Sequence, residues 1–359
     1  MEQVVPAMSA VERHRLVDEW ANGVELYDVP PVTKLIESGR RVPMVRTAVR
    51  YGGHILTYAE LFGSLDGGAI GTAGPSLDGL ARLFCDIAAA AAADSVLILG
   101  SSDIALTPDA LAAAADDRRA VVADCRSGRV DPAYGSADVR LFATAWDCAD
   151  AAVELLAALA DGATLVLATT AQRNDPIALA ELISTCAATH VVAEARTLAA
   201  LADRPAPALP TVRRWDITGT GCPAILSSLL GAIAPGSVAG FAYTAPEYAG
   251  IAARGPLDGT GRLRPIPGAR VLVLDDALGL CAPGVSGDVY LGGAALAAES
   301  GIAALADPFA PDGRIYPTGT RGRWNADGWL VFDVAESTNA AHVSDVDLGD
   351  PSDPVDYAA

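Results

Sequence analysis

The sequence has little positive charge: 25 lysine and arginine residues stand against 44 aspartate and glutamate residues, for a net charge of −19. No run of five basic residues occurs anywhere in the 359 residues. Nucleic acids and anionic membrane surfaces both bind clustered positive charge. The composition therefore argues against either kind of partner.

Long hydrophobic segments are also missing. The N-terminal residues are charged where a secretory signal needs an apolar core. The longest apolar run, residues 87–93, is mostly alanine and too short to cross a bilayer. Because 51% of the residues are nonetheless apolar, the chain has enough material for a sizeable core. We expect a cytoplasmic protein.

Cysteine and histidine occur without the spacings that bind metals. The six cysteines form no C-x-x-C pair, and the four histidines form no H-E-x-x-H motif. We expect reduced, mostly buried thiols and no metal site. An α/β hydrolase is also excluded, because no G-x-S-x-G elbow with a plausible downstream histidine occurs.

Short β-branched runs alternate with helical patterns through the middle of the chain. This alternation predicts a parallel sheet flanked by helices. Strands are expected at residues 120–123, 164–168, 189–193, 213–217 and 237–241, and helices at residues 149–160, 176–188, 196–202 and 223–233.

The region from residue 264 to 332 has a different pattern. Short apolar strands are separated by Gly/Pro turns, and Asp327-Gly328 is typical of a hairpin turn. We expect a small β-rich unit there. The predicted division of the chain is a linker helix and first part at 1–62, an α/β sheet domain at 63–259, the β-rich unit at 260–332, and an acidic, disordered tail at 333–359.

Five blocks of this β-rich region occur in the order and spacing of one family. They are the R-P-I…V-L-V-L-D segment at 264–275, P-G-V-S-G-D-V-Y-L-G-G at 283–293, D-P-F at 307–309, Y-P-T-G-T at 316–320 and R-W-N-A-D-G-W-L-V-F at 323–332. As a set they resemble the large lobe of adenylation domains of nonribosomal peptide synthetases, in the adenylate-forming superfamily. Residues 54–61 match the family's L-T-Y-x-E-L.

The resemblance implies a shortened and incomplete adenylation domain. The family has a further βαβ segment where residues 63–95 hold only a Gly-rich loop and one helix, at residues 77–93. The family's small C-terminal lobe, with its catalytic lysine, is expected to be absent after residue 332. Residues 12–23 resemble the linker that follows a condensation domain, which implies a condensation-type partner among other synthetase domains.

The phosphate loop of the family is reduced here to Gly100, Ser101 and Ser102, at the end of a strand predicted for residues 95–99. No lysine or arginine occurs between Asp94 and Asp117, and two aspartates lie in or near the loop instead. An aspartate carboxylate and a phosphate group about 4 Å apart would repel each other by roughly 4 kcal/mol at an effective dielectric of 20. The loop is therefore expected not to hold ATP in the family's manner.

Five more positions of the nucleotide pocket are identified by the resemblance. Gly219 lies in the Gly-rich turn that borders the adenine and substrate pocket. Tyr243 matches the tyrosine that stacks on adenine, and Glu247 matches the glutamate that helps to hold Mg²⁺. Thr320 replaces the aspartate that accepts both ribose hydroxyls, and Pro246 replaces a threonine that contacts phosphate. We interpret the pocket as vestigial, with Glu247 as a vestigial Mg²⁺ ligand.

Two aspartates lie near the position of the family's substrate-binding aspartate. Asp147 and Asp150 are both candidates to bind a substrate ammonium group, although neither is a clean match. The plainer interpretation, which we prefer, is that both are carboxylates at the start of a helix, stabilised by the helix dipole.

These departures favour a non-catalytic pseudo-adenylation domain that serves as a scaffold or docking module and has no catalytic residues and no cofactor. The alternative is residual amino-acid adenylation that uses ATP and Mg²⁺, with a small lobe supplied in trans.

Overall fold

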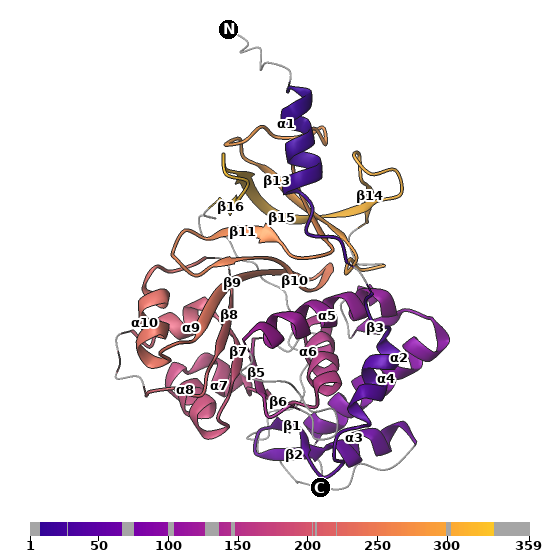
Figure 1. The fold of residues 1–359 in the computed structure, drawn as a ribbon, viewed down its shortest axis with the longest axis vertical. Coiled ribbons are helices and arrows are strands. Elements are labelled where there is room, and N and C mark those ends of the chain that lie inside the picture. The colour runs from indigo at the N-terminus through magenta and orange to yellow at the C-terminus, as the bar shows by residue number, and fades with distance from the viewer. Residues whose placement is uncertain are drawn as a thin grey trace, which may run out of the picture.

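A computed structural model describes residues 8–26, 28–66, 75–99, 104–125, 136–144, 148–202, 204, 207–219, 221–298 and 303–333. The molecule is built around one fourteen-stranded sheet, with helices against its lower part and a β-rich upper part (Figure 1). The strands of this sheet are β1 (Thr47–Tyr51), β2 (His54–Thr57), β5 (Val139–Ala143), β6 (Thr164–Leu167), β7 (His190–Glu194), β8 (Arg214–Thr218), β9 (Val238–Ala245), β10 (Tyr248–Pro256), β11 (Arg262–Pro265), β12 (Ala269–Leu274), β13 (Gly287–Gly293), β14 (Leu305–Ala306), β15 (Arg314–Trp324) and β16 (Leu330–Phe332). The helices are α1 (Ala10–His14), η1 (Arg15–Trp20), α2 (Val32–Gly39), α3 (Tyr58–Leu65), α4 (Pro75–Ala93), α5 (Pro108–Asp124), α6 (Cys148–Asp161), α7 (Thr170–Asn174), α8 (Pro176–Thr185), α9 (Ala195–Ala199) and α10 (Ile225–Ile233).

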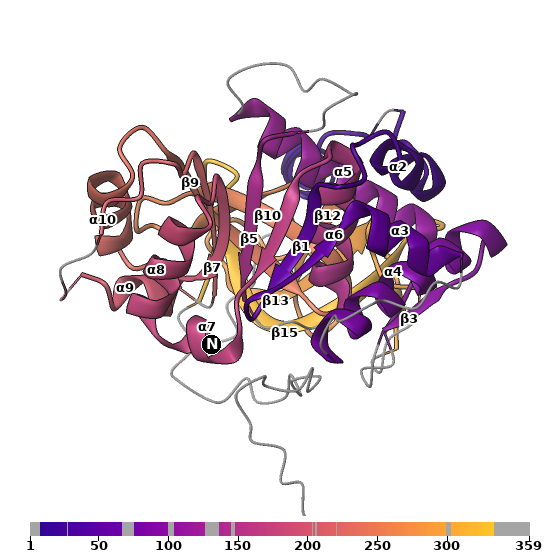
Figure 2. The same ribbon diagram turned by 90° about the horizontal axis from the view of Figure 1, so that it is seen from below.

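The first part of the sheet is parallel, in the order β1-β6-β5-β7-β8-β9, with β2 antiparallel at its edge. Helices α5 and α6 lie on one side of these strands, and α8, α9 and α10 lie on the other (Figures 1 and 2). Strands covered on both faces are continuously apolar, and all four residues of β6 are buried. The predicted parallel sheet flanked by helices is confirmed.

The second part is antiparallel and forms the β-rich unit. Its order is β10-β11-β16-β15-β13-β12, hydrogen-bonded to the first part through β9 and β10. The turn between β15 and β16 contains Gly328, at φ +75°. A Cβ atom there would lie 2.5 Å from the indole nitrogen of Trp20, so close approach as well as backbone conformation requires glycine.

The N-terminal helix packs on this unit, on the side of β13 in Figure 1. The predicted linker helix is present as α1 followed by a π-helical turn, η1, and ends at Trp20. The Trp20 and Trp324 rings lie 6.1 Å apart between centroids. Arg270 on β12 donates to the main-chain oxygen of Val17 (3.2 Å) and binds Asp307 (2.5 Å). The linker-like segment is therefore a packed part of this fold.

The strand predicted for residues 120–123 is wrong, because these residues continue α5. The Thr107 hydroxyl accepts from the amide of Ala110 (3.1 Å) and caps the helix, and Pro108 occupies its first turn. Alanines 112–115, the strongest helix formers, then carry the helix onward. Val122 is buried on the packed face of this helix.

The strand predicted for residues 95–99 forms, but outside the main sheet. It is β3 (Leu97–Leu99), which pairs with β4 (Ile104–Leu106) as a separate antiparallel hairpin. The sequence interpretation of a strand, a loop and then a helix missed β4. Among the described residues no helix is both long enough and apolar enough to cross a membrane.

Candidate functional site

Tyr243 and Thr320 meet at the junction between the two parts of the sheet, on β9 and β15. Their hydroxyl oxygens are 2.9 Å apart, and Thr320 Oγ1 is 2.7 Å from Thr318 Oγ1. The Thr318 hydroxyl donates to the main-chain oxygen of Val289 (2.9 Å). Thr318 therefore accepts the proton of Thr320, and Thr320 accepts the proton of Tyr243. The single donor of Thr320 is thus committed within the protein.

The ring of Tyr243 also has a partner within the chain. It lies 4.4 Å from the ring of Phe332, centroid to centroid, at an interplanar angle of 43°. Burial raises the pKa of the Tyr243 hydroxyl. Tyr243 and Thr320, two of the predicted pocket residues, are therefore brought together, but they bind each other.

Glu247 lies between β9 and β10 and is 8% exposed. Its main-chain oxygen accepts from the amide of Ala297 (2.8 Å). Burial raises the pKa of its carboxyl group.

Gly219 follows the carboxyl end of β8, at φ +132°, a conformation that favours glycine. The remaining predicted positions, Gly100, Ser101, Ser102 and Asp147, lie outside the described residues, as do residues 334–359 of the predicted tail.

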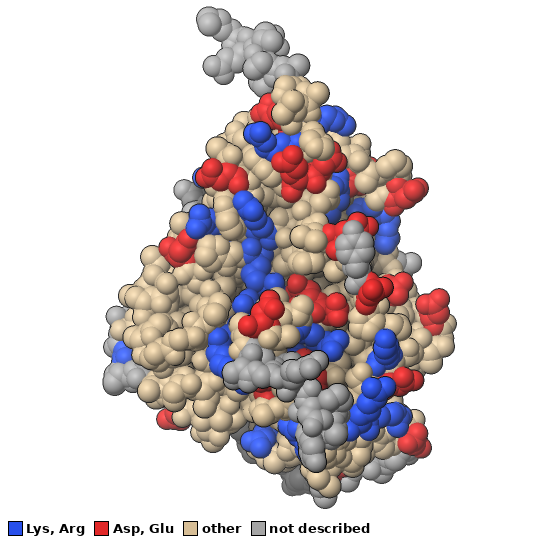
Figure 3. Space-filling model, in the orientation of Figure 1, with Lys and Arg blue, Asp and Glu red and all other residues tan. Residues whose placement is uncertain are grey.

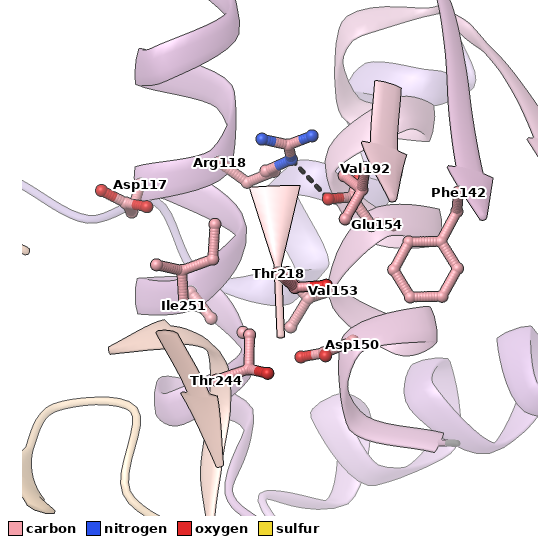
Figure 4. Close-up of a pocket in the computed structure, with 12 residues that line it drawn as sticks. Asp117, Arg118, Phe142, Asp150, Val153, Glu154, Val192, Thr218, Thr244 and Ile251 are labelled. Atoms are coloured by element: carbon pink, nitrogen blue, oxygen red, sulfur yellow. Dashed lines mark ion pairs between the residues drawn. The ribbon is translucent and has the colours of Figure 1, made fainter. Parts of the chain in front are cut away.

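A cavity opens between α5, α6 and strands β5, β7, β8, β9 and β10 (Figure 4). Asp150 lines it, so this candidate for substrate binding lies at a concave site. The space open to the centre of a water molecule is about 20 Å³. The lining residues are Ala114, Asp117, Arg118, Phe142, Asp150, Val153, Glu154, Val192, Thr218, Thr244, Gly250 and Ile251.

The inner wall of the cavity belongs to a buried ion network that we call the buried charge layer. It consists of Asp117, Arg118, Glu154, Arg214, Asp216 and Arg254. Arg118 pairs with Glu154, as the dashed line in Figure 4 marks, and with Asp216. Arg214 binds Asp216 at 2.7 Å, and Arg254 binds Asp117 at 3.0 Å. Three guanidinium groups thus balance three carboxylates.

The ionisation of Asp216 depends on this balance. Burial alone would raise the pKa of its fully buried carboxyl group. The adjacent guanidinium groups of Arg118 and Arg214 outweigh burial and lower the pKa below its usual range. Asp216 therefore stays charged at neutral pH, together with the arginines that surround it.

The sequence analysis found Asp150 but missed the members of the buried charge layer. The available signal was the pair Arg214 and Asp216, two charged residues within one predicted strand, because buried charges are almost always paired. Arg118 on α5 and Arg254 on β10 come close to Asp216 only in the folded chain.

On the face shown in Figure 3, positive charge is interspersed with negative charge. Figure 3 shows a narrow stripe of basic side chains over the region of β11 and β16, with acidic groups beside it. Arg262 and Arg264 on β11 stack on Trp329, with guanidinium carbons 4.8 and 4.4 Å from the ring centroid. Arg262 also pairs with Asp258 at 3.0 Å. Such a mixed surface does not match the broad basic face of a nucleic-acid binder.

The solved structures that share this fold include two of adenylation-type proteins. The nonribosomal peptide synthetase FmoA3 superposes with a TM-score of 0.71 at 18% identity, over 91% of this chain and 45% of that one. The N-terminal subdomain of NpsA from Klebsiella oxytoca, solved in complex with 3-hydroxyanthranilyl-AMSN, superposes with a TM-score of 0.62 at 14% identity. That superposition covers 86% of this chain and 99% of the subdomain. The predicted large-lobe architecture is confirmed.

Sequence relatives point the same way. The probable nonribosomal peptide synthetase CymA of Salinispora arenicola is 35% identical over 212 residues, which cover 54% of this chain and 3% of CymA. Novobiocin biosynthesis protein H of Streptomyces niveus is 36% identical over 192 residues, which cover 50% of this chain and 31% of that protein. The chain thus spans less than a third of these relatives. The model of the AMP-binding enzyme family matches residues 117–299, slightly more than half of the chain, and the protein therefore belongs to the AMP-binding enzyme family.

Proposed function

We propose that this chain is a non-catalytic adenylation-type domain that serves as a scaffold or docking module in nonribosomal peptide biosynthesis. The observation that carries the proposal is the hydroxyl chain at Thr320, where the related domains place an aspartate for the ribose of ATP. A neutral hydroxyl that already accepts a hydrogen bond from Tyr243 is a weak substitute for a charged acceptor of two hydrogen bonds. The loss is about 1.5–3 kcal/mol of binding free energy.

The cavity supports the same proposal. A space of about 20 Å³ for the centre of a water molecule exceeds by little the roughly 10–15 Å³ that one water needs. The enclosed part of the cavity therefore has room for about one water molecule. Side chains of the buried charge layer form the inner wall of the cavity.

The docked N-terminal helix supports a scaffold role. A neighbouring domain joined before residue 8 would be held against the β-rich unit through Trp20 and Arg270. The relatives named above include a synthetase far longer than this chain, and we propose a condensation-type domain as the partner. A pull-down with synthetase domains as prey tests this: recovery of condensation domains is expected, and recovery of none contradicts the docking role.

Calorimetric titration with ATP and Mg²⁺ tests the loss of the nucleotide site. We expect no saturable heat at millimolar nucleotide. Magnesium-dependent binding in the micromolar range would contradict the proposal.

Residual amino-acid adenylation is the second candidate, favoured by the retention of Tyr243 and Glu247 and by the place of Asp150 at the cavity. Pyrophosphate exchange with a panel of amino acids, with and without an added small lobe, separates the two candidates. Exchange well above background in either condition would favour the enzyme.

A further inference from the structure

Arg118 fills the inner end of the cavity from within the protein. It projects from α5 and is 3% exposed, yet it is one of the residues that line the cavity (Figure 4). Its Nη1 donates a hydrogen bond to Asp216 Oδ2, and its Nε lies in ion-pair contact with Glu154 Oε1 without forming an aligned hydrogen bond. One guanidinium group is thus held by two carboxylates from two different elements, α6 and β8.

These two carboxylates form a preorganised acceptor for a planar cation. The side chains of Glu154 and Asp216 are 7% and 0% exposed, and Asp216 is fixed further by Arg214 at 2.7 Å. A guanidinium group presents donors in a rigid fork that matches carboxylate oxygens. An ammonium ion has no such fork.

The charge count shows what the site requires. Without Arg118, the buried charge layer would hold two arginines, Arg214 and Arg254, against three carboxylates, Asp117, Glu154 and Asp216. One uncompensated buried negative charge would remain, and such a charge is strongly unfavourable. The vacated volume adjoins the cavity, so a small ligand could reach it.

We propose that Glu154 and Asp216 form a guanidinium-binding site that the chain occupies with its own Arg118. The occupant closes the cavity as a built-in plug. When Arg118 is removed, the site takes a free guanidinium or amidinium compound. The inference rests on the proposed function and deepens it. A cavity that Arg118 closes cannot serve as a substrate pocket, as expected of a non-catalytic domain.

The test is chemical rescue of Arg118→Ala in the full chain. We expect a lower melting temperature than that of the wild-type protein. Methylguanidinium chloride at low millimolar concentration should then raise the melting temperature of the variant by at least about 2 °C, because a ligand that binds only the folded state stabilises it. The wild-type protein, with its site filled, should not respond.

Three controls isolate the site. Methylammonium chloride at equal ionic strength should not raise the melting temperature of Arg118→Ala, because an ammonium group lacks the planar fork of N–H donors. Arg119→Ala removes the neighbouring arginine, which pairs with Asp116 and Asp161 instead, and should not respond to methylguanidinium. The double variant Arg118→Ala/Glu154→Gln lacks one of the two acceptor charges. Methylguanidinium should not raise its melting temperature.

Equal responses of Arg118→Ala and Arg119→Ala, or no response of Arg118→Ala, would overturn the proposal. If Arg118→Ala does not accumulate in folded form, it is refolded from urea with and without methylguanidinium. Folding only with methylguanidinium supports the site, and no folding in either condition counts against it. No nucleotide is present in these assays, so their failure is distinguishable from a failure of the ATP titration.

Discussion

Glu247 is a buried carboxylic acid, 8% exposed, at a position that the sequence resemblance predicts for a Mg²⁺ ligand. Burial raises the pKa of its carboxyl group. A carboxyl group with a higher pKa in the folded than in the unfolded state favours folding in its protonated form. Its stabilising contribution is therefore present below the unfolded pKa, about 4.3, and is lost as the pH rises through the folded pKa.

Glu247→Gln should consequently raise the melting temperature at pH 7, where the wild-type carboxyl group is charged and buried. The difference should shrink towards zero below about pH 4, where both side chains are neutral. Melting curves from pH 3.5 to 8 measure this. Glu37→Gln, at an exposed position on α2, is the control and should change little. A pH-independent difference for Glu247→Gln would contradict the assignment.

Tyr243→Phe tests the hydroxyl chain. Loss of the Tyr243 donor should lower the free energy of unfolding by about 1 kcal/mol, the value of a typical hydrogen bond. Urea unfolding of Tyr243→Phe, Thr320→Val and the double variant forms a double-mutant cycle. Additive effects would show that the two hydroxyls do not interact.

The residues of the site were only partly predictable. Tyr243, Glu247 and Thr320 could be found because each lies within a short motif beside turn residues of fixed spacing. Arg118 and Glu154 could not, because each is an ordinary charged residue in a helix pattern. Only the packing of α5 on α6 and β8 pairs Arg118 with Glu154 and Asp216 and buries all three side chains.

At the scale of elements, α5 shows where local patterns mislead. Two adjacent valines suggested a strand at residues 120–123, yet the helix begins at Pro108 and runs through them to Asp124. Its capped start and alanine run outweigh a β-branched pair, which lowers helix propensity only slightly. The strands between residues 164 and 241 were predicted well, because each is a short run bounded by helical patterns or turns in a regular alternation.

Thr107→Ala should therefore lower the free energy of unfolding by about 1 kcal/mol through loss of the helix cap. Urea unfolding followed by circular dichroism measures the change. Thr33→Ala, at an exposed position within α2, provides the control and should have an effect near zero. Equal effects of the two substitutions would mean that the cap does not stabilise α5.

At the scale of the whole molecule, residues far apart in sequence hold the N-terminal helix on the β-rich unit. Arg270 joins Val17, Asn22 and Asp307, and the Asp307 side chain is fully buried. Without Arg270, the buried carboxylate of Asp307 would lose its ion pair with the Arg270 guanidinium group. The sequence suggested a linker helix. The surface on which this helix docks could not be predicted, because it depends on contacts between residues about 250 positions apart in the sequence.

Arg270→Ala should lower the free energy of unfolding by about 3–5 kcal/mol and expose α1 and η1 to trypsin, with faster cleavage after Arg13 and Arg15. Urea unfolding and timed proteolysis followed by mass spectrometry measure the two effects. Arg321→Ala breaks a more exposed pair with Asp288 and should cost less than about 1 kcal/mol. Unchanged proteolysis in Arg270→Ala would contradict the docking role.

The charge balance beneath the cavity also constrains how such a sequence can diverge. Exchange of Arg118, Glu154 or Asp216 alone leaves an uncompensated ion in the interior, whereas a matched exchange of an acid and a base conserves neutrality. Homologous chains should therefore gain or lose these side chains in pairs. Such covariation would record a neutrality requirement that acts independently of any catalytic selection.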